Sequence, residues 1–470
     1  MNLPPTYSHS SVIKKIAVLF IISASIGTGA YLGKMSPDQV FVISVFSGSI
    51  LGTLLFWDFR LAFVFTGGGI LVLTRNVGIK SFIEYASLDV IVFLIGMMIV
   101  VGMVKEAGFF SWLVKRLLAI RNLGGFGLFI IIMILSAALS GVTGEVTSII
   151  VMAAAILDIS DLLEIDPVPL IISSVMTTNI GSASTLLGNP IGILIALRGN
   201  LTFEDFLTQA MPLSALLLAA VVLILCLWYR EYLRDITSRL VTLGREKRTS
   251  HDIAFDSKKI YSIVLFSLMI ILIAMHKRLE MVLGIRENEL LIVLPIIFAG
   301  ISLLFCRGRA LFCIEHEVEW KSLLFFMFLF AQAGVVQASG VAQFLTEKLL
   351  AQIGSHPNAL VGVTLFSSGI LSGILDNTVV VASYIPVVKN LHLMDSTLHL
   401  LWWALLFGAC FGGNITAIGS TANIVALGIL EKERNIKINF VEWLKLGLVI
   451  GVVSMAIAYL ALLWVPIFPE

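Results

Sequence analysis

Two carboxylates stand inside otherwise apolar stretches of the chain and could carry ion chemistry. Asp376 lies in SGILDNTVV, and Glu145 lies in SGVTGEVTS. A charged side chain at the centre of a bilayer costs about 3 kcal/mol on insertion scales, so it is normally retained for an ion pathway, a proton relay or a partner. Burial in hydrocarbon also penalises the charged form of a carboxylate. This would suit proton coupling at Glu145.

Neutral polar residues interrupt two long apolar segments, TTNIGSASTLLGNPIG at 177–192 and GGNITAIGSTAN at 412–423. Hydrocarbon cannot satisfy free backbone or amide groups, so both segments must face protein or a wet cavity. The glycines, and Pro190, which removes a helix hydrogen bond, favour a broken helix at each point. The free ends of the half-helices can then hold an ion.

The hydroxyl, amide and carboxylate side chains of these four stretches form the predicted binding site for a substrate or ion. Packing between helices is the alternative for each single serine or threonine. The predicted residues are Thr143, Glu145, Thr147, Asn179, Ser182, Ser184, Thr185, Asn189, Asp376, Asn377, Thr378, Asn414, Thr416, Ser420, Thr421 and Asn423.

Oxygen ligands in this set suit Na⁺, whereas amides, hydroxyls and helix N-termini suit an anion. The predicted sodium ligands are Ser372, Asp376, Asn377, Asn414 and Thr416. The coupling ion is expected to be Na⁺ or H⁺, with no other cofactor and no catalytic residue.

The composition places these stretches in a membrane. Of the 470 residues, 58% are hydrophobic and 13% are charged, compared with about 25% charged in soluble domains. At about 20 apolar residues per span, about eleven helices are expected. Their ranges are near 15–33, 40–57, 60–74, 87–104, 168–197 (interrupted), 211–229, 259–275, 288–305, 319–337, 400–430 (interrupted) and 441–466. A cleaved signal peptide is the alternative for the first, but its length favours a retained helix.

Two further apolar segments, 126–157 and 359–388, are broken at their centres by the polar motifs around Glu145 and Asp376. Each half has about 13 apolar residues, too few to span a bilayer, so each segment is expected to be a re-entrant hairpin. An N-terminus inside the cell places most of the 31 Lys and Arg residues on the cytoplasmic side, as the positive-inside rule requires.

The polar motifs occur twice along the chain. Gly188 in TLLGNPIGI matches Gly419 in TAIGSTANI, Ser140 matches Ser372, and the two separations agree to within one residue. This indicates an internal duplication. An odd number of spans per copy, five, means that the copies lie inverted in the membrane. The predicted domains are an extra N-terminal transmembrane helix (1–38), a first repeat (39–229), a cytoplasmic basic linker (230–258) and a second repeat (259–470).

The expected fold is therefore an all-α polytopic membrane protein with two inverted five-helix repeats, each holding a re-entrant helical hairpin and an interrupted helix. Five motifs carry a family resemblance: LIGMMIVVGMVKEAG, DPVPLIISSVMTTNIGSASTLLGNP, VEWKSLLFF, SGILDNTVVVASYIP and GGNITAIGSTANIVA. Together they resemble the ion transporter superfamily, within its arsenite permease, sodium-proton antiporter and P protein group, and more distantly the dicarboxylate-sodium symporters. The resemblance implies an often dimeric scaffold part, a transport part made of the hairpins and interrupted helices, and elevator-like movement.

The sequence departs from this family in its first half. Members usually carry an Asp-Asn pair in both hairpins; here the second keeps Asp376 and Asn377, but the first has Gly144 and Glu145. The usual Gly-Asp-Pro-Pro-Asn of the first interrupted helix is here Gly-Asn-Pro-Ile-Gly, at 188–192. By resemblance, an intact cation site is expected in the second half.

We predict a secondary active transporter that moves a small inorganic ion or small anion together with, or in exchange for, H⁺ or Na⁺. The alternatives are a dicarboxylate or other anion symporter driven by sodium, and an ion channel. No HExxH or GxSxG signature points to an enzyme. The expected location is the inner, cytoplasmic-type membrane, and the expected partners are the small ion or anion, membrane lipid and a second copy of the chain through the scaffold part, with no nucleic acid.

Overall fold

The computed structural model describes residues 9–118, 124–242, 257–306, 309–354, 356–394 and 399–464. Within those ranges every regular element is a helix, so the all-α prediction is confirmed. In the described part of the chain, nine helices are long and apolar enough to cross a bilayer. The polytopic membrane class is therefore confirmed as well. The chain forms two compact units.

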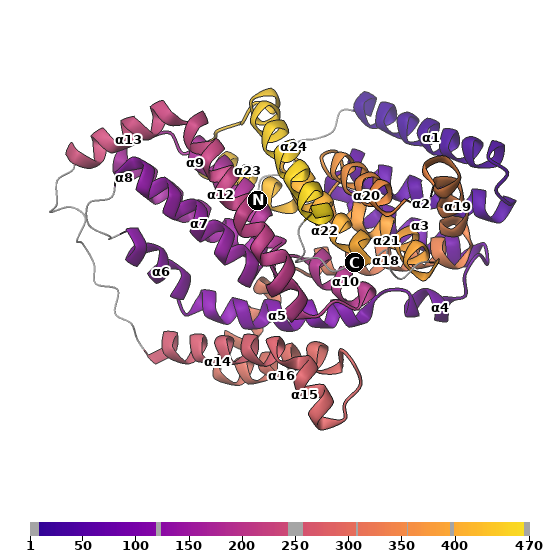
Figure 1. Ribbon diagram of the computed structural model, residues 1–470, viewed down its shortest axis with the longest axis horizontal. Coiled ribbons are helices and arrows are strands. Elements are labelled where there is room, and N and C mark those ends of the chain that lie inside the picture. The colour runs from indigo at the N-terminus through magenta and orange to yellow at the C-terminus, as the bar shows by residue number, and fades with distance from the viewer. Residues whose placement is uncertain are drawn as a thin grey trace. The chain divides into compact units, whose positions relative to one another are not determined.

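The smaller unit comprises Met1–Ile91, Glu319–His356 and Ala382–Ser396. Gln332 is fully buried in it and donates a hydrogen bond from Nε2 to the carbonyl oxygen of Val64 over 2.9 Å, which ties two helices together. The helices of this unit are α1 (His9–Leu32), α2 (Pro37–Leu55), η1 (Trp57–Phe59), α3 (Arg60–Leu73), α4 (Ile79–Glu84), α18 (Trp320–Ala338) and α19 (Val341–Ile353) (Figure 1).

The larger unit comprises Val92–Val318, Pro357–Val381 and Thr397–Glu470. Both predicted hairpins' tips and both interrupted helices belong to it. Its first helices are α5 (Leu88–Glu106, starting in the smaller unit), α6 (Phe109–Leu118), α7 (Gly125–Thr143), α8 (Glu145–Leu163), α9 (Val168–Ser182), α10 (Pro190–Gly199), α11 (Phe203–Asp205), η2 (Phe206–Ala210), α12 (Met211–Trp228) and α13 (Arg230–Thr242).

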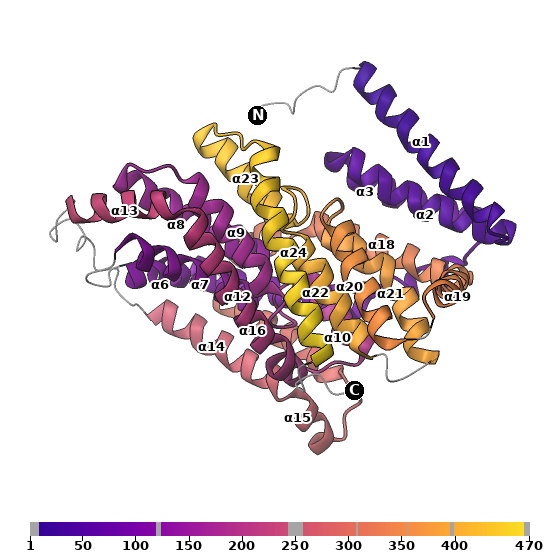
Figure 2. The ribbon, with the colours of Figure 1, turned by 45° about the horizontal axis from the view of Figure 1, so that its top comes forward.

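The remaining helices of the larger unit follow residue 256. They are α14 (Ser257–Ala274), α15 (His276–Leu283), α16 (Glu289–Cys306), α17 (Ala310–Phe312), η5 (Cys313–Glu317), α20 (Pro357–Ser372), α21 (Asn377–Met394, ending in the smaller unit), α22 (Leu400–Gly412), α23 (Thr421–Arg434) and α24 (Phe440–Trp464). In Figure 2, α20, α22 and α24 lie side by side.

The predicted arm length of the first hairpin is wrong. Its arms, α7 and α8, have 19 residues each, which is enough to cross a bilayer, and not about 13. The prediction ended each arm at the polar motif, but the motif is helical. The hydroxyl of Thr143 donates to the carbonyl oxygen of Leu139 over 2.9 Å, and Ser148 donates to that of Ser136 over the same distance. Backbone acceptors therefore allow polar residues to continue both helices.

Residues 230–258, predicted as a basic linker, begin with an ordered helix. In α13 the side chains of Leu233 and Ile236 are fully buried, so one face packs on the unit. Tyr232 donates its hydroxyl to the carbonyl oxygen of Asp166, and burial raises the pKa of Tyr232, so the hydroxyl stays a donor. Residues 243–256 of the predicted linker lie outside the described residues.

Candidate ion and substrate site

The first hairpin turns at a single residue, Gly144, whose φ is +91°. A residue with a side chain rarely adopts this backbone conformation. The helix that follows begins with Glu145, which is 3% exposed. The Glu145 backbone N–H donates to the carbonyl oxygen of Gly188 over 2.9 Å. The hairpin tip is therefore joined directly to the predicted break in the first interrupted helix.

Both open ends of this hairpin lie against α13. The hydroxyl of Thr237 accepts a hydrogen bond from the Gly125 N–H over 2.9 Å at the start of α7. The guanidinium of Arg239 donates to the carbonyl oxygens of Leu163 and Glu164 at the end of α8, at 3.2 and 2.6 Å. The two open ends of the hairpin thus lie on one side of the unit, opposite its tip.

The first interrupted helix is broken between Ser182 and Pro190, as predicted. Asn189 caps the second half: its Oδ1 accepts from the Gly192 N–H over 2.7 Å. The amide nitrogen of Asn189 donates to the hydroxyl oxygen of Ser182 at 2.9 Å and lies 3.2 Å from the sulfur of Cys410. One amide therefore links the two half-helices to a residue of the second repeat.

The second interrupted helix is broken between Gly412 and Thr421. Ser420 caps its second half by accepting from the Ala422 N–H over 3.1 Å. The hydroxyl of Thr416 donates to the carbonyl oxygen of Gly373 over 2.6 Å. In the first half, Thr185 donates in the same way to the carbonyl oxygen of Gly141.

Close backbone contacts repeat between the two halves in the same manner. A methyl group added at Gly181 would lie 2.1 Å from the carbonyl oxygen of Ala137, and one added at Gly412 would lie 2.1 Å from that of Gly369. These contacts pack α9 on α7 and α22 on α20. Gly181 and Gly412 are as far apart in the chain as the paired sequence motifs, to within one residue, and so are Ala137 and Gly369. The structure therefore confirms the internal duplication.

A buried cluster of amides joins the two breaks. The Asn179 amide nitrogen donates to the side-chain oxygens of Asn414 and Asn423 over 2.8 and 2.9 Å. The Asn179 side-chain oxygen accepts from the hydroxyl of Ser420 over 3.0 Å. All four residues are at most 1% exposed. Burying polar groups at this depth is tolerated because they satisfy one another.

The cluster also shows how the halves are related. By the repeat, Asn179 corresponds to Cys410, and Asn189 corresponds to Ser420. The contact of Asn179 with Ser420 therefore has a counterpart in the contact of Asn189 with Cys410. Two contacts that exchange in this way are what a local twofold relation produces, as the inverted repeat predicts.

Asp376 lies where two helices begin. It is 5% exposed, and its Oδ1 accepts from the Thr378 N–H over 3.0 Å at the start of α21. Its Oδ2 accepts from the hydroxyl of Thr421 over 2.8 Å at the start of α23. The N-terminal ends of both helices carry partial positive charge, so the carboxylate sits at two of these ends.

The citrate transporter family matches residues 14–408, and a second, overlapping match covers residues 291–468. The chain belongs to this family. It is 31% identical over 380 residues to an uncharacterised transporter of Mycobacterium tuberculosis, covering 79% of this chain and 84% of that one. It is 26% identical over 453 residues to the P protein of Homo sapiens, covering 81% of this chain and 54% of the P protein. The predicted resemblance to the ion transporter superfamily is confirmed.

A solved structure supports the fold of this citrate transporter family member. The YdaH transporter of Alcanivorax borkumensis matches with a TM-score of 0.54 at 15% identity, over 84% of this chain and 89% of that one. At this identity the likeness concerns the fold. The chain is thus a membrane transporter whose substrate must be argued from its own site.

The predicted site residues of this transporter fall into three groups. One group joins the two halves and consists of Asn179, Asn189, Asn414, Ser420 and Asn423. A second lies at a tip or a helix start and consists of Glu145, Asp376, Asn377, Thr378 and Thr421. The third group makes hydrogen bonds within its own half and consists of Thr143, Ser182, Ser184, Thr185, Ser372 and Thr416. Thr147 is half-buried on the first turn of α8.

Two of the predicted sodium ligands donate their hydroxyl protons to backbone carbonyl oxygens. Ser372 donates to the carbonyl oxygen of Ala409 over 2.6 Å, and Thr416 donates to that of Gly373. The Asn414 side-chain oxygen accepts from Asn179, and its nitrogen donates to the carbonyl oxygen of Met176 over 3.2 Å. Asp376 and Asn377 are therefore the members of the predicted sodium set that lie at a tip.

Sequence reasoning missed Cys410. It is buried, it contacts the amide of Asn189, and it lies within electrostatic range of Glu145. In the sequence it lies in an apolar segment with no metal-ligand spacing, so nothing distinguished it from a packing residue. The signal that could have found it is the repeat itself, which sets Cys410 at the position of Asn179.

Proposed function

We propose that this protein is a secondary active transporter that carries a small anion or small inorganic ion and couples its movement to Na⁺ or H⁺. The observation that carries the proposal is Asp376, a buried carboxylate held at the starts of α21 and α23. Glu145 is a second buried carboxylate, at the start of α8. In the described residues of α7–α10 and α20–α23, no lysine or arginine is buried beside them.

Charge balance supports a coupling cation. A buried charge without a partner is strongly unfavourable, and the described surroundings of Asp376 supply dipoles and a hydroxyl. A bound Na⁺ or a proton would balance the carboxylate when the tip is closed from water. The nearby oxygens of Asn377 and Thr421 are hard ligands of the kind that Na⁺ accepts.

Helix N-termini support an anion as the carried solute. Both α10 and α23 start within a break, after Asn189 and Ser420, and the partial positive charge at such starts attracts anions. Because the family is named for citrate transport, citrate is the first substrate to test. A small carboxylate held by N–H groups and hydroxyls needs no buried arginine.

Exchange of Na⁺ for H⁺ without a carried anion is the second candidate. The specific observation in its favour is that the two hairpins differ at the start of their second arms. The first hairpin has Glu145 at the start of α8, whereas the second has Asn377 at the start of α21 and Asp376 just before it. Two unlike carboxylates can serve two unlike cations.

We further propose an elevator-type movement of the parts that hold the solute. Both hairpin tips and both breaks belong to the larger compact unit. The bonds of Asn179 tie the two breaks to each other, and those of Glu145 and Thr416 tie each hairpin to its break, so these parts can move as one body. The proposed setting is the inner membrane with the N-terminus inside, and the proposed assembly is a homodimer through the scaffold part.

The test is transport by purified protein in liposomes that contain a pH-sensitive dye. Labelled citrate, labelled Na⁺ and arsenite are offered separately, with and without Na⁺ and pH gradients. Citrate uptake that depends on either gradient supports the first candidate, and proton movement on addition of Na⁺ alone supports the second. Current steps in a planar bilayer, or no transport of any solute, would contradict the proposal.

The matched variants are Asp376→Asn and Asp158→Asn. Asp376→Asn removes the charge while keeping an oxygen for the Thr378 N–H, so uptake should fall at least about 100-fold, equivalent to about 3 kcal/mol. Asp158 is exposed on α8, so its substitution should leave uptake unchanged. Equal uptake by both variants would remove Asp376 from the coupling step.

A further inference from the structure

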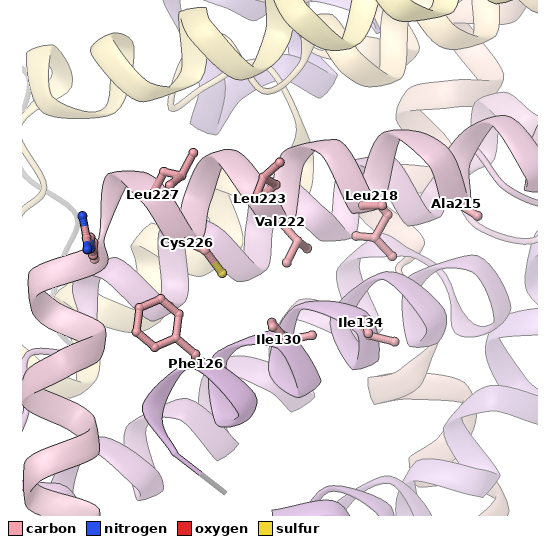
Figure 3. Close-up of a pocket in the computed structure, with 11 residues that line it drawn as sticks. Phe126, Ile130, Ile134, Ala215, Leu218, Val222, Leu223, Cys226 and Leu227 are labelled. Atoms are coloured by element: carbon pink, nitrogen blue, oxygen red, sulfur yellow. The ribbon is translucent and has the colours of Figure 1, made fainter.

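An apolar groove lies between α7 and α12, away from the hairpin tip. Its volume is about 710 Å³, within the range of about 300–1,000 Å³ typical of ligand pockets. Figure 3 shows Phe126, Ile130 and Ile134 of α7 facing Val222 and Cys226 of α12 across it. The lining residues are Phe126, Ile130, Ile134, Ala215, Leu218, Ala219, Val222, Leu223, Cys226, Leu227 and Arg230.

Helical periodicity produces this groove. On α7 the lining residues recur every four positions, so they share one face. On α12 the small residues Ala215 and Ala219 stand on the facing stripe, one turn apart. Because alanine projects only a methyl group, the stripe leaves a channel where larger side chains would have filled the space.

One end of the groove is basic. Arg230, the first residue of α13, lines it, and Arg234 stands one turn further along the same face of that helix. Both arginines are exposed. In the part of the chain that the structure describes, neither forms an ion pair with a carboxylate. A pair of unneutralised guanidinium groups suits a phosphate.

Aromatic residues fix the depth of this end. Trp228, which is 49% exposed, and Tyr229 and Tyr232 surround the junction of α12 and α13. Tryptophan and tyrosine gather at the level of lipid headgroups. Arg230 therefore lies at that level, and the groove runs from it into the hydrocarbon.

The length of the groove matches an acyl chain. From Ala215 to Trp228, the last residue of α12, the helix rises about 20 Å at 1.5 Å per residue, more than half of a hydrocarbon core about 30 Å thick. A chain descending from the headgroup level can lie along it. The apolar lining would accept the chain of any lipid, whereas the two arginines would select a headgroup with net negative charge.

We propose that this groove binds an anionic glycerophospholipid, with one acyl chain between α7 and α12 and the phosphate on Arg230 and Arg234. The bound lipid contacts the same helix, α7, that ends at the Gly144 turn. The inference does not depend on which solute the protein carries.

The test is native mass spectrometry of the purified full-length protein with equal amounts of dioleoyl phosphatidylglycerol and dioleoyl phosphatidylcholine. The wild type should bind the anionic lipid in excess. The double variant R230Q/R234Q should reduce this excess by about fivefold for each arginine. Ala219→Trp, which fills the groove, should lower binding of both lipids to one site.

Two controls separate this site from general lipid contact. Lys432→Gln removes an exposed cation at the end of α23, and Leu216→Trp enlarges a side chain on α12 that is 57% exposed and outside the groove. Both should bind lipid as the wild type does. An excess of anionic lipid that survives in R230Q/R234Q, or that falls equally in Lys432→Gln, would overturn the proposal. Because both arginines are exposed, R230Q/R234Q is expected to fold, so the test does not depend on whether Ala219→Trp folds.

Discussion

The hydroxyl of Thr421 donates a hydrogen bond to Asp376 Oδ2 over 2.8 Å, and this contact joins the start of α23 to the start of α21. One end of the contact belongs to the second hairpin and the other to the second interrupted helix. An ion or proton that binds the Asp376 carboxylate therefore changes contacts of both the hairpin and the interrupted helix. The contact gives the first prediction.

Thr421→Val should slow transport by about 10- to 100-fold, because a hydrogen bond to a charged group is worth about 1.5–3 kcal/mol. Valine keeps the shape of threonine but has no donor. Thr421→Ser keeps the donor and should retain most of the rate. The measurement is the initial rate of uptake as the coupling cation is varied. Equal rates for the valine and serine variants would show that the hydroxyl plays no part.

Glu145→Gln should flatten the pH dependence of transport. Glutamine has nearly the same shape but cannot exchange a proton, and Glu145 is a buried carboxylate at the first hairpin turn. The measurement is the uptake rate across the pH range in liposomes of matched internal pH. Glu164→Gln, exposed just after the same helix, is the control. A pH profile like that of the wild type would remove Glu145 from the mechanism.

Asn179→Ala should lower the free energy of unfolding by about 2 kcal/mol, because it leaves buried oxygens of Asn414 and Asn423 without their donor. The measurement is the thermal midpoint of the protein in detergent. Asn358→Ala, at the exposed start of α20, should change stability by less than about 0.5 kcal/mol. A midpoint for Asn179→Ala that matches this control would show that the amide cluster contributes little.

Gly412→Ala should reduce the yield of folded protein, because its methyl group would lie 2.1 Å from the carbonyl oxygen of Gly369. Backbone atoms cannot move aside cheaply, so the expected cost is about 3 kcal/mol. Gly428→Ala on α23 meets no atom within 4 Å; it should be neutral or stabilise by up to about 1 kcal/mol. Fluorescence-detected size-exclusion chromatography measures both. Normal yield of Gly412→Ala would contradict the close packing of α22 on α20.

Most of the fold could be predicted from the sequence because bilayer spans are long, apolar and bounded by charge. The two breaks were also readable, since glycines stand beside a run of polar residues at each of them, and Pro190 removes a helix hydrogen bond at the first. The first hairpin's arms were not, because Thr143 and Ser148 stay helical by donating to backbone oxygens. Composition alone does not reveal such bonds.

The sequence indicated which polar residues lie in the buried breaks and tips, but not which of them contact one another. Asn414 was expected to hold an ion, yet its side chain bonds to Asn179 and to the backbone of Met176. These partners lie 235 and 238 residues away in the other copy, so their meeting depends on tertiary packing. The groove beside Arg230 escaped notice for the same reason, since its two walls are far apart in the chain.

The paired hydroxyl bonds of Thr185 and Thr416 end on backbone oxygens, those of Gly141 and Gly373. Every amino acid supplies a carbonyl, so mutation of the accepting residue need not destroy the link. Each copy can therefore exchange its ionisable tip residues without losing its framework, and the difference between Gly144-Glu145 in one tip and Asp376-Asn377 in the other has the form of such an exchange. Substitutions in the two short turns would thus alter which ions the tips attract while the anchoring of each hairpin to its break is kept.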